Sequence, residues 1–99
     1  MYQLIYTDRA ITDLQKAGKW YNSKQNGLGE KFIDYVLKFA DDIKEYPYTP
    51  ASKYKNTREI YISKYPYLLI YSIEEQMIFI LRIFPCKTQP KKKYKSSKK

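Results

Sequence analysis

The chain has 99 residues, a length that supports one compact domain but not two separate hydrophobic cores. Its formal net charge is +9, yet seven of the nineteen basic residues fall between Lys87 and Lys99, where there is no acidic residue, so residues 1–86 carry only +2. With no histidine and one cysteine, the sequence excludes a Ser-His-Asp triad, a Cys-His pair, the usual zinc sites and an internal disulfide. Any catalysis would depend on Lys, Arg, Tyr or carboxylate side chains.

No apolar run of the sequence approaches the roughly 20 residues needed to cross a membrane. The first residues also lack the basic and apolar regions of a signal peptide. These two absences predict a protein that acts in the reducing cytoplasm, without a membrane partner. Hydrophobic residues make up 43% of the chain, which is enough for a packed core ahead of the basic C-terminal stretch.

The first predicted elements are a short strand at residues 2–6 and a helix that follows it directly. Thr7 or Asp8 can cap this helix, because either side-chain oxygen can accept an orphan amide of the first turn. Apolar residues at three- and four-residue steps extend the helix to about Tyr21, and the Asn-Gly pair at 26–27 then supplies the left-handed conformation that ends a helix. The apolar face consists of Ala10, Leu14, Ala17 and Tyr21.

A longer amphipathic helix is predicted across residues 30–45. It must end near Tyr46, because Pro47 has no amide to donate and disfavours helical geometry in the residue before it. Two helices joined by a short turn should form an antiparallel hairpin whose apolar faces cover a common surface. The apolar positions of the second helix are Leu28, Phe32, Tyr35, Val36, Phe39, Ile43 and Tyr46.

Three later strands should provide the surface that the hairpin covers. Residues 47–56 are predicted to be a loop with two prolines, and strands follow at 59–63, 67–73 and 77–84, separated by short hairpin turns. The last two strands lack polar alternation and should be central in the sheet. The predicted fold class is α+β, in the order β-α-α-β-β-β, with an antiparallel sheet and an N-terminal helical hairpin packed on one face.

The C-terminal residues differ from the rest in composition. Residues 1–90 are predicted to form a single domain, and residues 91–99 a mobile Lys-rich tail with almost no apolar residue to bury. Within this tail, the run Lys91–Lys93 either binds phosphate or an acidic protein surface, or is a solvated electrostatic tether. Tyr94, alone among lysines, either stacks on a base, docks on the body of the protein or has no specific role.

Seven short motifs occur in a distinctive order between Leu4 and about Lys91. They are Ala10-x-x-Asp13-Leu14, Gly27-Leu28-Gly29-x-x-Phe32, Tyr46-Pro47, Arg58 at the head of a strand, Tyr65-Pro66-Tyr67-Leu68-Leu69-Ile70-Tyr71, Ile80-Leu81-Arg82-Ile83-Phe84 and Lys87-x-x-Pro90. Each motif is degenerate alone, but their order and spacing resemble the RelE/ParE toxins of bacterial type II toxin-antitoxin systems, often labelled plasmid stabilisation proteins.

The resemblance implies a toxin that an acidic cognate antitoxin binds in a hetero-oligomer and holds inactive, with no cofactor. One branch of the family cuts mRNA in the ribosomal decoding site with Arg, Lys and Tyr side chains, and the other poisons DNA gyrase and has lost this cluster. The nuclease branch carries a Tyr-Arg step where this chain has Tyr67-Leu68, and an aliphatic residue cannot stabilise a pentacovalent phosphate. The sequence therefore resembles ParE more closely, which favours a gyrase inhibitor. The first alternative is a metal-independent mRNA endoribonuclease, and the second is a non-toxic RNA-binding or adaptor protein of the same fold.

No catalytic residue is assigned firmly, and no metal site is predicted. The resemblance gives four nuclease candidates: Arg58, Arg82, Lys87 and Tyr94. In some order they would act as phosphate clamp, transition-state clamp, general base or acid, and activator of the 2′-hydroxyl. The candidates for binding the target or a nucleic acid are Arg58, Arg82, Lys87, Lys91, Lys92 and Lys93.

Arg82 interrupts an otherwise apolar strand, so its charge needs water, a carboxylate or a ligand. Either it faces a binding groove together with Arg58, or it lies on the wet face of the sheet and pairs across strands with Glu59 or Glu74. Most of the twelve tyrosines are predicted to pack in the core rather than to stack on bases. The packing tyrosines singled out are Tyr21, Tyr35, Tyr61 and Tyr71.

Overall fold

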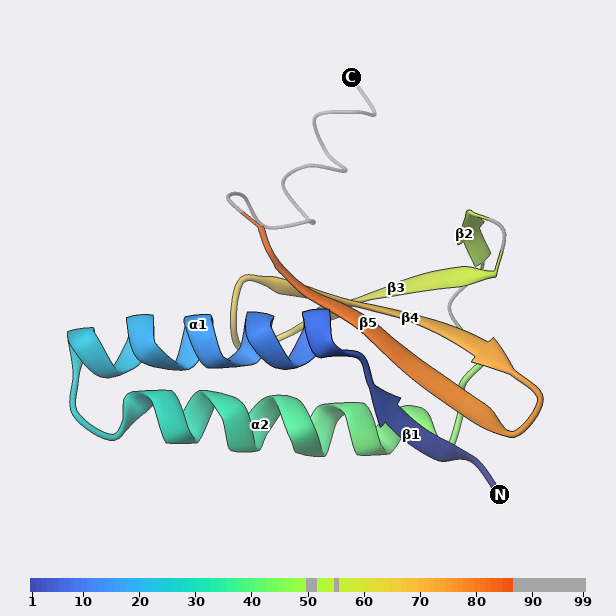
Figure 1. The fold of residues 1–99 in the computed structure, drawn as a ribbon, viewed down its shortest axis with the longest axis horizontal. Coiled ribbons are helices and arrows are strands. Elements are labelled where there is room, and N and C mark those ends of the chain that lie inside the picture. Colours follow the sequence, from blue (N-terminus) through green and yellow to red (C-terminus); the bar gives the residue numbers. More distant parts are fainter. Residues whose placement is uncertain (50–51, 55, 87–99) are drawn as a thin grey trace.

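The computed structural model describes residues 1–49, 52–54 and 56–86 (Figure 1). In chain order the elements of these residues are β1 (Gln3–Tyr6), α1 (Asp8–Lys24), α2 (Leu28–Ile43), β2 (Ser52–Tyr54), β3 (Thr57–Ile62), β4 (Tyr67–Glu74) and β5 (Met77–Pro85). The predicted α+β class is confirmed, with a helical hairpin ahead of most of the sheet. Neither described helix has the length and apolar character needed to span a membrane.

The strands form a sheet in the order β1-β5-β4-β3-β2. β4 and β5 are internal, as their lack of polar alternation predicts. The prediction of a wholly antiparallel sheet was wrong, because β1 runs parallel to β5 in a register that extends from Gln3 opposite Met77 to Tyr6 opposite Ile80. A parallel neighbour requires a long crossover connection, and the helical hairpin is part of the chain that connects these two strands.

The segment predicted as a loop between residues 47 and 56 also contains a strand, β2. It pairs antiparallel with β3 through Ser52 opposite Arg58 and Tyr54 opposite Thr57, with a register shift between the two pairs. Three residues are too few to show an alternating pattern, and the prolines of this segment indicated a loop. An edge strand is the place in a sheet where a neighbouring proline is tolerated, because one side of the strand has no ladder to maintain.

The helix boundaries follow local capping chemistry. Thr7 is the N-cap of α1, since its Oγ1 accepts a hydrogen bond from the Ala10 amide at 3.2 Å. α1 continues to Lys24, slightly beyond the predicted end. The left-handed conformation predicted at the Asn-Gly pair lies at Gly27, with φ +87°, where it opens α2 as its N-cap.

The core lies between the helical hairpin and one face of the sheet. Its buried hydrophobic side chains come from both helices and from β3, β4 and β5, and Phe32, Val36, Leu69, Tyr71 and Ile80 are among those with no exposed surface. The packing predicted for the tyrosines is confirmed for Tyr21, Tyr35 and Tyr71. It was wrong for Tyr61, which pairs with Leu68 on the opposite face of the sheet and is only half-buried.

Tyr71 connects the sheet to the end of the helical hairpin. Its buried hydroxyl donates a hydrogen bond to the Pro47 carbonyl oxygen at 2.7 Å. We expect Tyr71→Phe to lower the free energy of unfolding by about 1 kcal/mol, because the carbonyl loses a buried partner. Urea unfolding measures this loss, and Tyr46→Phe, at a tyrosine with 72% of its surface exposed, is the control. Equal stability of the two variants would contradict the role given to the Tyr71 hydroxyl.

The two helices are in close contact where Gly18 of α1 faces Gly29 of α2. A β-carbon placed on Gly29 would overlap the Gly18 carbonyl oxygen and come within 2.7 Å of the Asn22 side chain. The Asn22 amide oxygen accepts a hydrogen bond from the Gly29 backbone amide at 2.7 Å, so it satisfies one of the free amides at the start of α2. The contact between the helices therefore explains Gly29, the second glycine of the motif Gly27-Leu28-Gly29-x-x-Phe32.

Candidate functional site

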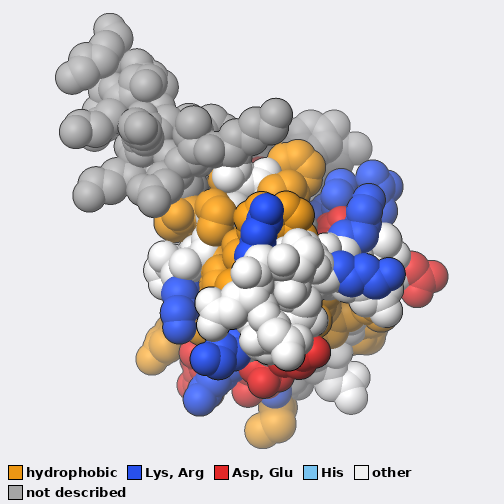
Figure 2. Space-filling model, turned by 90° about the vertical axis from the view of Figure 1, so that its left-hand side faces the viewer, with side chains coloured by type: hydrophobic (Ala, Val, Ile, Leu, Met, Phe, Trp, Pro, Cys, Tyr) orange, Lys and Arg blue, Asp and Glu red, His pale blue; other side chains and the backbone are white. Residues whose placement is uncertain are grey.

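A groove lies between the second half of α1 and the end of β5. Its volume is about 450 Å³, and we call it the α1–β5 groove. Figure 2 shows the end of the molecule where α1 joins α2, with hydrophobic side chains gathered across its upper part and lysine and arginine side chains beside and among them. The aromatic and apolar residues that line the groove include Trp20, Tyr21, Tyr67, Ile83, Phe84 and Pro85.

The rim of the groove is positively charged. Lys16 and Arg82 line it, and the Lys24 ammonium lies 4.9 Å from the centroid of the Trp20 ring. Asp13 also lines the groove, but this carboxylate is bound to Arg82. The Asp13 and Arg82 charges offset each other, so an approaching ligand meets aromatic rings with the cations Lys16 and Lys24 beside them.

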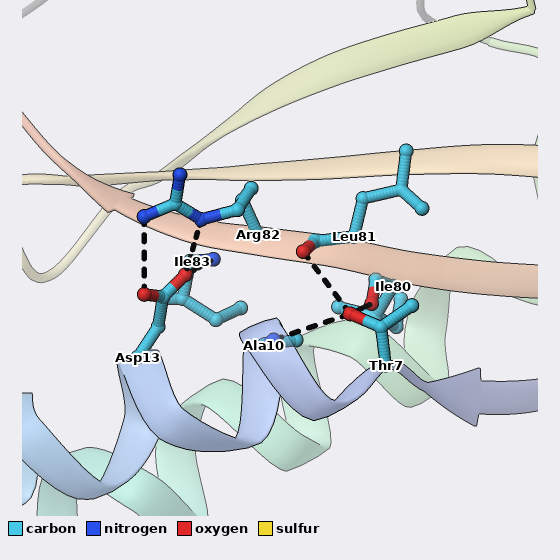
Figure 3. A network of polar contacts seen from close by, with 7 residues as sticks. All are labelled: Thr7, Ala10, Asp13, Ile80, Leu81, Arg82 and Ile83. Atoms are coloured by element: carbon cyan, nitrogen blue, oxygen red, sulfur yellow. Dashed lines mark hydrogen bonds and ion pairs between the residues drawn. The ribbon is translucent and has the colours of Figure 1, made fainter.

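Asp13 and Arg82 join α1 to β5 through an ion pair with two hydrogen bonds (Figure 3). The Arg82 Nε donates to Asp13 Oδ2 at 2.8 Å, and its Nη2 donates to Oδ1 at 3.1 Å. The same Oδ2 accepts the backbone amide of Ile83 at 2.9 Å. The Asp13 side chain is only 12% exposed and that of Arg82 29%, so the pair is partly shielded from water.

Beyond the point where β1 ends, backbone groups on the outer edge of β5 find hydrogen-bond partners in Thr7 and Asp13. Thr7 continues the ladder, because its amide donates to the Ile80 carbonyl at 3.1 Å and its hydroxyl lies within hydrogen-bonding distance of the Ile80 and Leu81 carbonyls. Asp13 then takes the amide of Ile83. Side chains of α1 and its cap thus replace a neighbouring strand along this part of β5.

The ion pair changes the protonation chemistry of both partners. Burial alone would raise the pKa of the Asp13 carboxyl, but hydrogen bonds from Arg82 and Ile83, with the charges of Arg82 and Arg9, outweigh burial and lower that pKa. The hydrogen bond to Asp13 raises the pKa of Arg82 above its ordinary value. Both side chains are therefore charged throughout the physiological pH range.

The cross-strand partners predicted for Arg82 were wrong. Arg82 pairs with Asp13 of α1, not with Glu59 of β3 or Glu74 of β4. The amphipathic pattern of α1 placed Asp13 among the polar residues that point away from the core. That pattern could not show that β5 lies beside this part of the helix, because the two residues are 69 positions apart in the chain.

Arg58 lies on the face of the sheet that the helices cover. Its register partner is Tyr71, whose side chain is buried against the helices, and its guanidinium carbon lies 5.0 Å from the centroid of the Tyr48 ring. Burial raises the pKa of the Tyr71 phenol, and the nearby Arg58 charge partly offsets this effect. Arg58 thus belongs to the end of the molecule where the chain leaves α2.

Arg82, in contrast, pairs with Ile70, on the face of the sheet that points away from the helices. Its guanidinium carbon also lies 5.3 Å from the centroid of the Phe84 ring, which is on the same face. The two candidate arginines are thus on opposite faces and do not line one groove.

The remaining candidate residues lie outside the part of the chain that the structure describes. They are Lys87, Lys91, Lys92, Lys93 and Tyr94. In the described part of the chain, no three His, Cys, Asp or Glu side chains are arranged to hold a metal ion.

Sequence reasoning missed three residues of the groove. Trp20 falls outside the apolar stripe of α1 and is 55% exposed, Phe84 is 45% exposed, and Asp13 had been given no role beyond the polar face. The one available signal was Trp20, because a lone tryptophan on the polar side of an amphipathic helix is unusual for a residue of its size. Asp13 and Phe84 each belong to one of the seven motifs, but those motifs do not show that the two residues lie beside one groove.

Comparison with protein families gives a match over most of the chain. The profile of a family described as the ParE toxin of type II toxin-antitoxin system, parDE, matches residues 4–90. A curated relative, Toxin RelE3 from Caulobacter vibrioides, is 29% identical over 77 residues, which make up 76% of this chain and 84% of the relative.

Solved structures share the fold. A chain of the chromosomal ParDE TA system from P. aeruginosa superposes with a TM-score of 0.78 at 18% identity, covering 88% of this chain and 98% of that one. The isolated E. coli RelE toxin has a TM-score of 0.63 at 17% identity, with 99% and 98% covered. A chain of the intact E. coli RelBE toxin-antitoxin complex has a TM-score of 0.62 at 19% identity, with 89% and 100% covered.

Proposed function

This chain belongs to the ParE toxin family of type II toxin-antitoxin systems, and from that membership we propose that it is a ParE-like toxin that inhibits DNA gyrase. The observation that carries the proposal is the match of the ParE family profile from residue 4 to residue 90. The higher TM-score with the ParDE chain than with the two RelE chains supports the same choice, although it compares folds alone.

The positions of the arginines also support an inhibitor over a nuclease. A nuclease of this family without histidine needs preorganised cations that converge on one phosphate. Arg82 is held by Asp13 through two hydrogen bonds, and Arg58 lies on the other face of the sheet. Leu68 occupies the position where the nuclease branch carries arginine. The two candidate arginines, Arg58 and Arg82, are not arranged to share one substrate.

A RelE-like mRNA endoribonuclease is the second candidate function. It is favoured by the curated relative, which is named Toxin RelE3 and is 29% identical. In that case Arg58, Arg82, Lys87 and Tyr94 would be the residues to test first. A non-toxic RNA-binding or adaptor role remains the third.

Type II toxins are controlled by an antitoxin, and one of the structures that share this fold is an intact toxin-antitoxin complex. We propose that the cognate antitoxin of this chain is acidic, that the two proteins form a hetero-oligomer, and that the toxin acts in the cytoplasm. We also propose that residues 1–90 form the toxin domain and that the basic residues 91–99, with Lys91–Lys93, form a separate tail.

Purified gyrase tests the proposed activity directly. We expect the protein to reduce supercoiling of relaxed plasmid DNA and to increase the fraction of cleaved plasmid after protein removal. Addition of the antitoxin should abolish both effects. The contrasting reaction contains translating ribosomes and a defined mRNA, and its cleavage sites are mapped by primer extension. Codon-phased cuts in the mRNA with unaffected gyrase would replace the gyrase proposal with the nuclease.

A further inference from the structure

We propose that the α1–β5 groove binds single-stranded DNA, whose unpaired bases stack on Trp20 and Phe84 and whose phosphates lie against the surrounding lysines. The choice of DNA rests on the proposed function, because gyrase acts on DNA. The site itself is argued from the described residues of the groove and does not use Arg58, which lies on the other face of the sheet.

Two exposed aromatic rings line the groove. Trp20 is 55% exposed and Phe84 is 45% exposed, and Tyr21 and Tyr67 line the same depression. Every nucleobase has a flat π-face, so an exposed ring in a positively charged groove stacks on an unpaired base of any sequence. The volume of about 450 Å³ is within the range of sites that hold small organic groups, about 300–1,000 Å³. The groove therefore has both the rings and the space for a base.

A cation lies near each of these two rings. The Lys24 ammonium is 4.9 Å from the centroid of the Trp20 ring, and the Arg82 guanidinium carbon is 5.3 Å from that of Phe84. Lys16 lines the groove as well, whereas the Arg82 charge is offset by Asp13. A strand whose bases stack on these rings therefore carries its phosphates past the charges of Lys16 and Lys24.

Two lysine-rich stretches of the sequence include or directly follow residues of the groove. Residues 14–24 of α1 contain three lysines and no acidic residue, and residues 87–99 contain seven lysines and no acidic residue. Cys86 lines the groove and directly precedes Lys87. The rest of the chain has nine basic and ten acidic residues, so the excess positive charge belongs to these two stretches. Such a concentration of lysines favours a ligand with a repeated negative charge.

The groove favours an unpaired strand over a duplex or an extended peptide. A base in a duplex is already stacked on its neighbours, and taking it out costs free energy, whereas a base in a single strand is free to turn toward a ring. An added peptide strand would need the outward amides of β5. The Ile83 amide is bonded to Asp13 and residue 85 is a proline, which has no amide hydrogen.

The two kinds of contact have different salt dependence, and this difference tests the site. Fluorescence anisotropy of a labelled single strand of about 12 thymidines measures its binding to the full-length protein as the salt concentration rises. We expect Trp20→Ala and Phe84→Ser each to weaken binding at least about fivefold without changing the slope of log affinity against log salt, because stacking releases no counterions. Lys16→Gln and Lys24→Gln should each reduce that slope by about 0.7.

Matched variants separate loss of the site from loss of the fold. Tyr46→Ala removes a ring that is 72% exposed at the end of α2, and Lys38→Gln removes an exposed lysine of α2. We expect both controls to keep the affinity within about twofold. Trp20→Phe keeps a ring and should restore most of the binding that Trp20→Ala loses. In the wild type, DNA should quench the emission of Trp20, the single tryptophan of the chain, because a stacked base quenches an indole.

The other outcomes overturn the inference or the proposed function separately. Binding that Trp20→Ala and Phe84→Ser leave unchanged, without quenching of Trp20, would overturn the site and assign the affinity to lysine charge alone. Equal binding of a duplex of the same length would overturn stacking, and tighter binding of the matching RNA would overturn the choice of DNA. Inhibition of gyrase without binding of the oligonucleotide would overturn this inference and leave the proposed function intact. Binding with the stacking signature but no effect on gyrase would overturn the proposed function and leave the site intact.

Discussion

Gly29→Ala is expected to lower the free energy of unfolding by about 3 kcal/mol, because the new methyl group has no space between the helices. Its β-carbon would overlap the Gly18 carbonyl oxygen and lie 2.7 Å from the Asn22 side chain. A backbone oxygen cannot rotate away as a side chain can, so α1 and α2 must separate. Separation also lengthens the hydrogen bond from the Gly29 amide to Asn22. Urea unfolding at neutral pH, followed by circular dichroism, measures the loss.

Gly18→Ala is the matched control on the facing helix. Its β-carbon would lie 2.8 Å from Cδ1 of Ile33, the far end of a flexible side chain that can move. Alanine also favours helix over glycine by about 1 kcal/mol, so the net change should stay within about 1 kcal/mol of the wild type. A Gly29→Ala protein as stable as the Gly18→Ala protein would show that the hairpin does not depend on the close approach at Gly29.

Asp13→Ala is expected to have the second large effect, a decrease of about 2 kcal/mol in the free energy of unfolding. It removes two hydrogen bonds from Arg82 and one from the Ile83 amide, and among the described residues β1, which pairs with β5 only as far as Ile80, does not reach that amide. The Arg82 side chain is 29% exposed, so water can partly solvate its orphaned charge and limits the loss. Asp34→Ala, an exposed aspartate on α2, should change stability by less than about 0.5 kcal/mol.

The contribution of Asp13 to the free energy of unfolding should also decrease as the solution becomes acidic. The folded protein lowers the pKa of Asp13 below the unfolded value of about 3.9, so folding favours the charged carboxylate. The stabilisation is complete above the unfolded pKa and is lost as the pH falls through the lower folded pKa. The stability difference between the wild type and Asp13→Asn should therefore be largest near neutral pH and shrink below about pH 4. A difference that grows on acidification would contradict the direction of the shift.

The same ion pair shapes the α1–β5 groove. Asp13 and Arg82 both line the α1–β5 groove, and their contact ties the helix wall to the strand wall. It also occupies the Ile83 amide that an added strand would need.

The amino-acid sequence by itself determined the elements whose signals are local. The apolar stripe of α2, the cap at Thr7 and the left-handed turn at Gly27 are each set by residues within a few positions of one another. The continuous apolar runs of β4 and β5 likewise predict their central place in the sheet, because only strands covered by neighbours can avoid polar alternation. The order and spacing of the motifs were enough to indicate the toxin family.

Only the tertiary structure decided the features that depend on distant residues meeting. β1 is parallel to β5 because of where the helical hairpin returns the chain, which no property of residues 3–6 encodes. Arg82 meets Asp13 across 69 positions, although Glu74, in the adjoining strand β4, is much closer to it in the sequence. The groove between Trp20 and Phe84 exists because α1 crosses the end of β5. Local periodicity reports which face of an element is buried, but the choice of partner element is set by packing the whole chain at once.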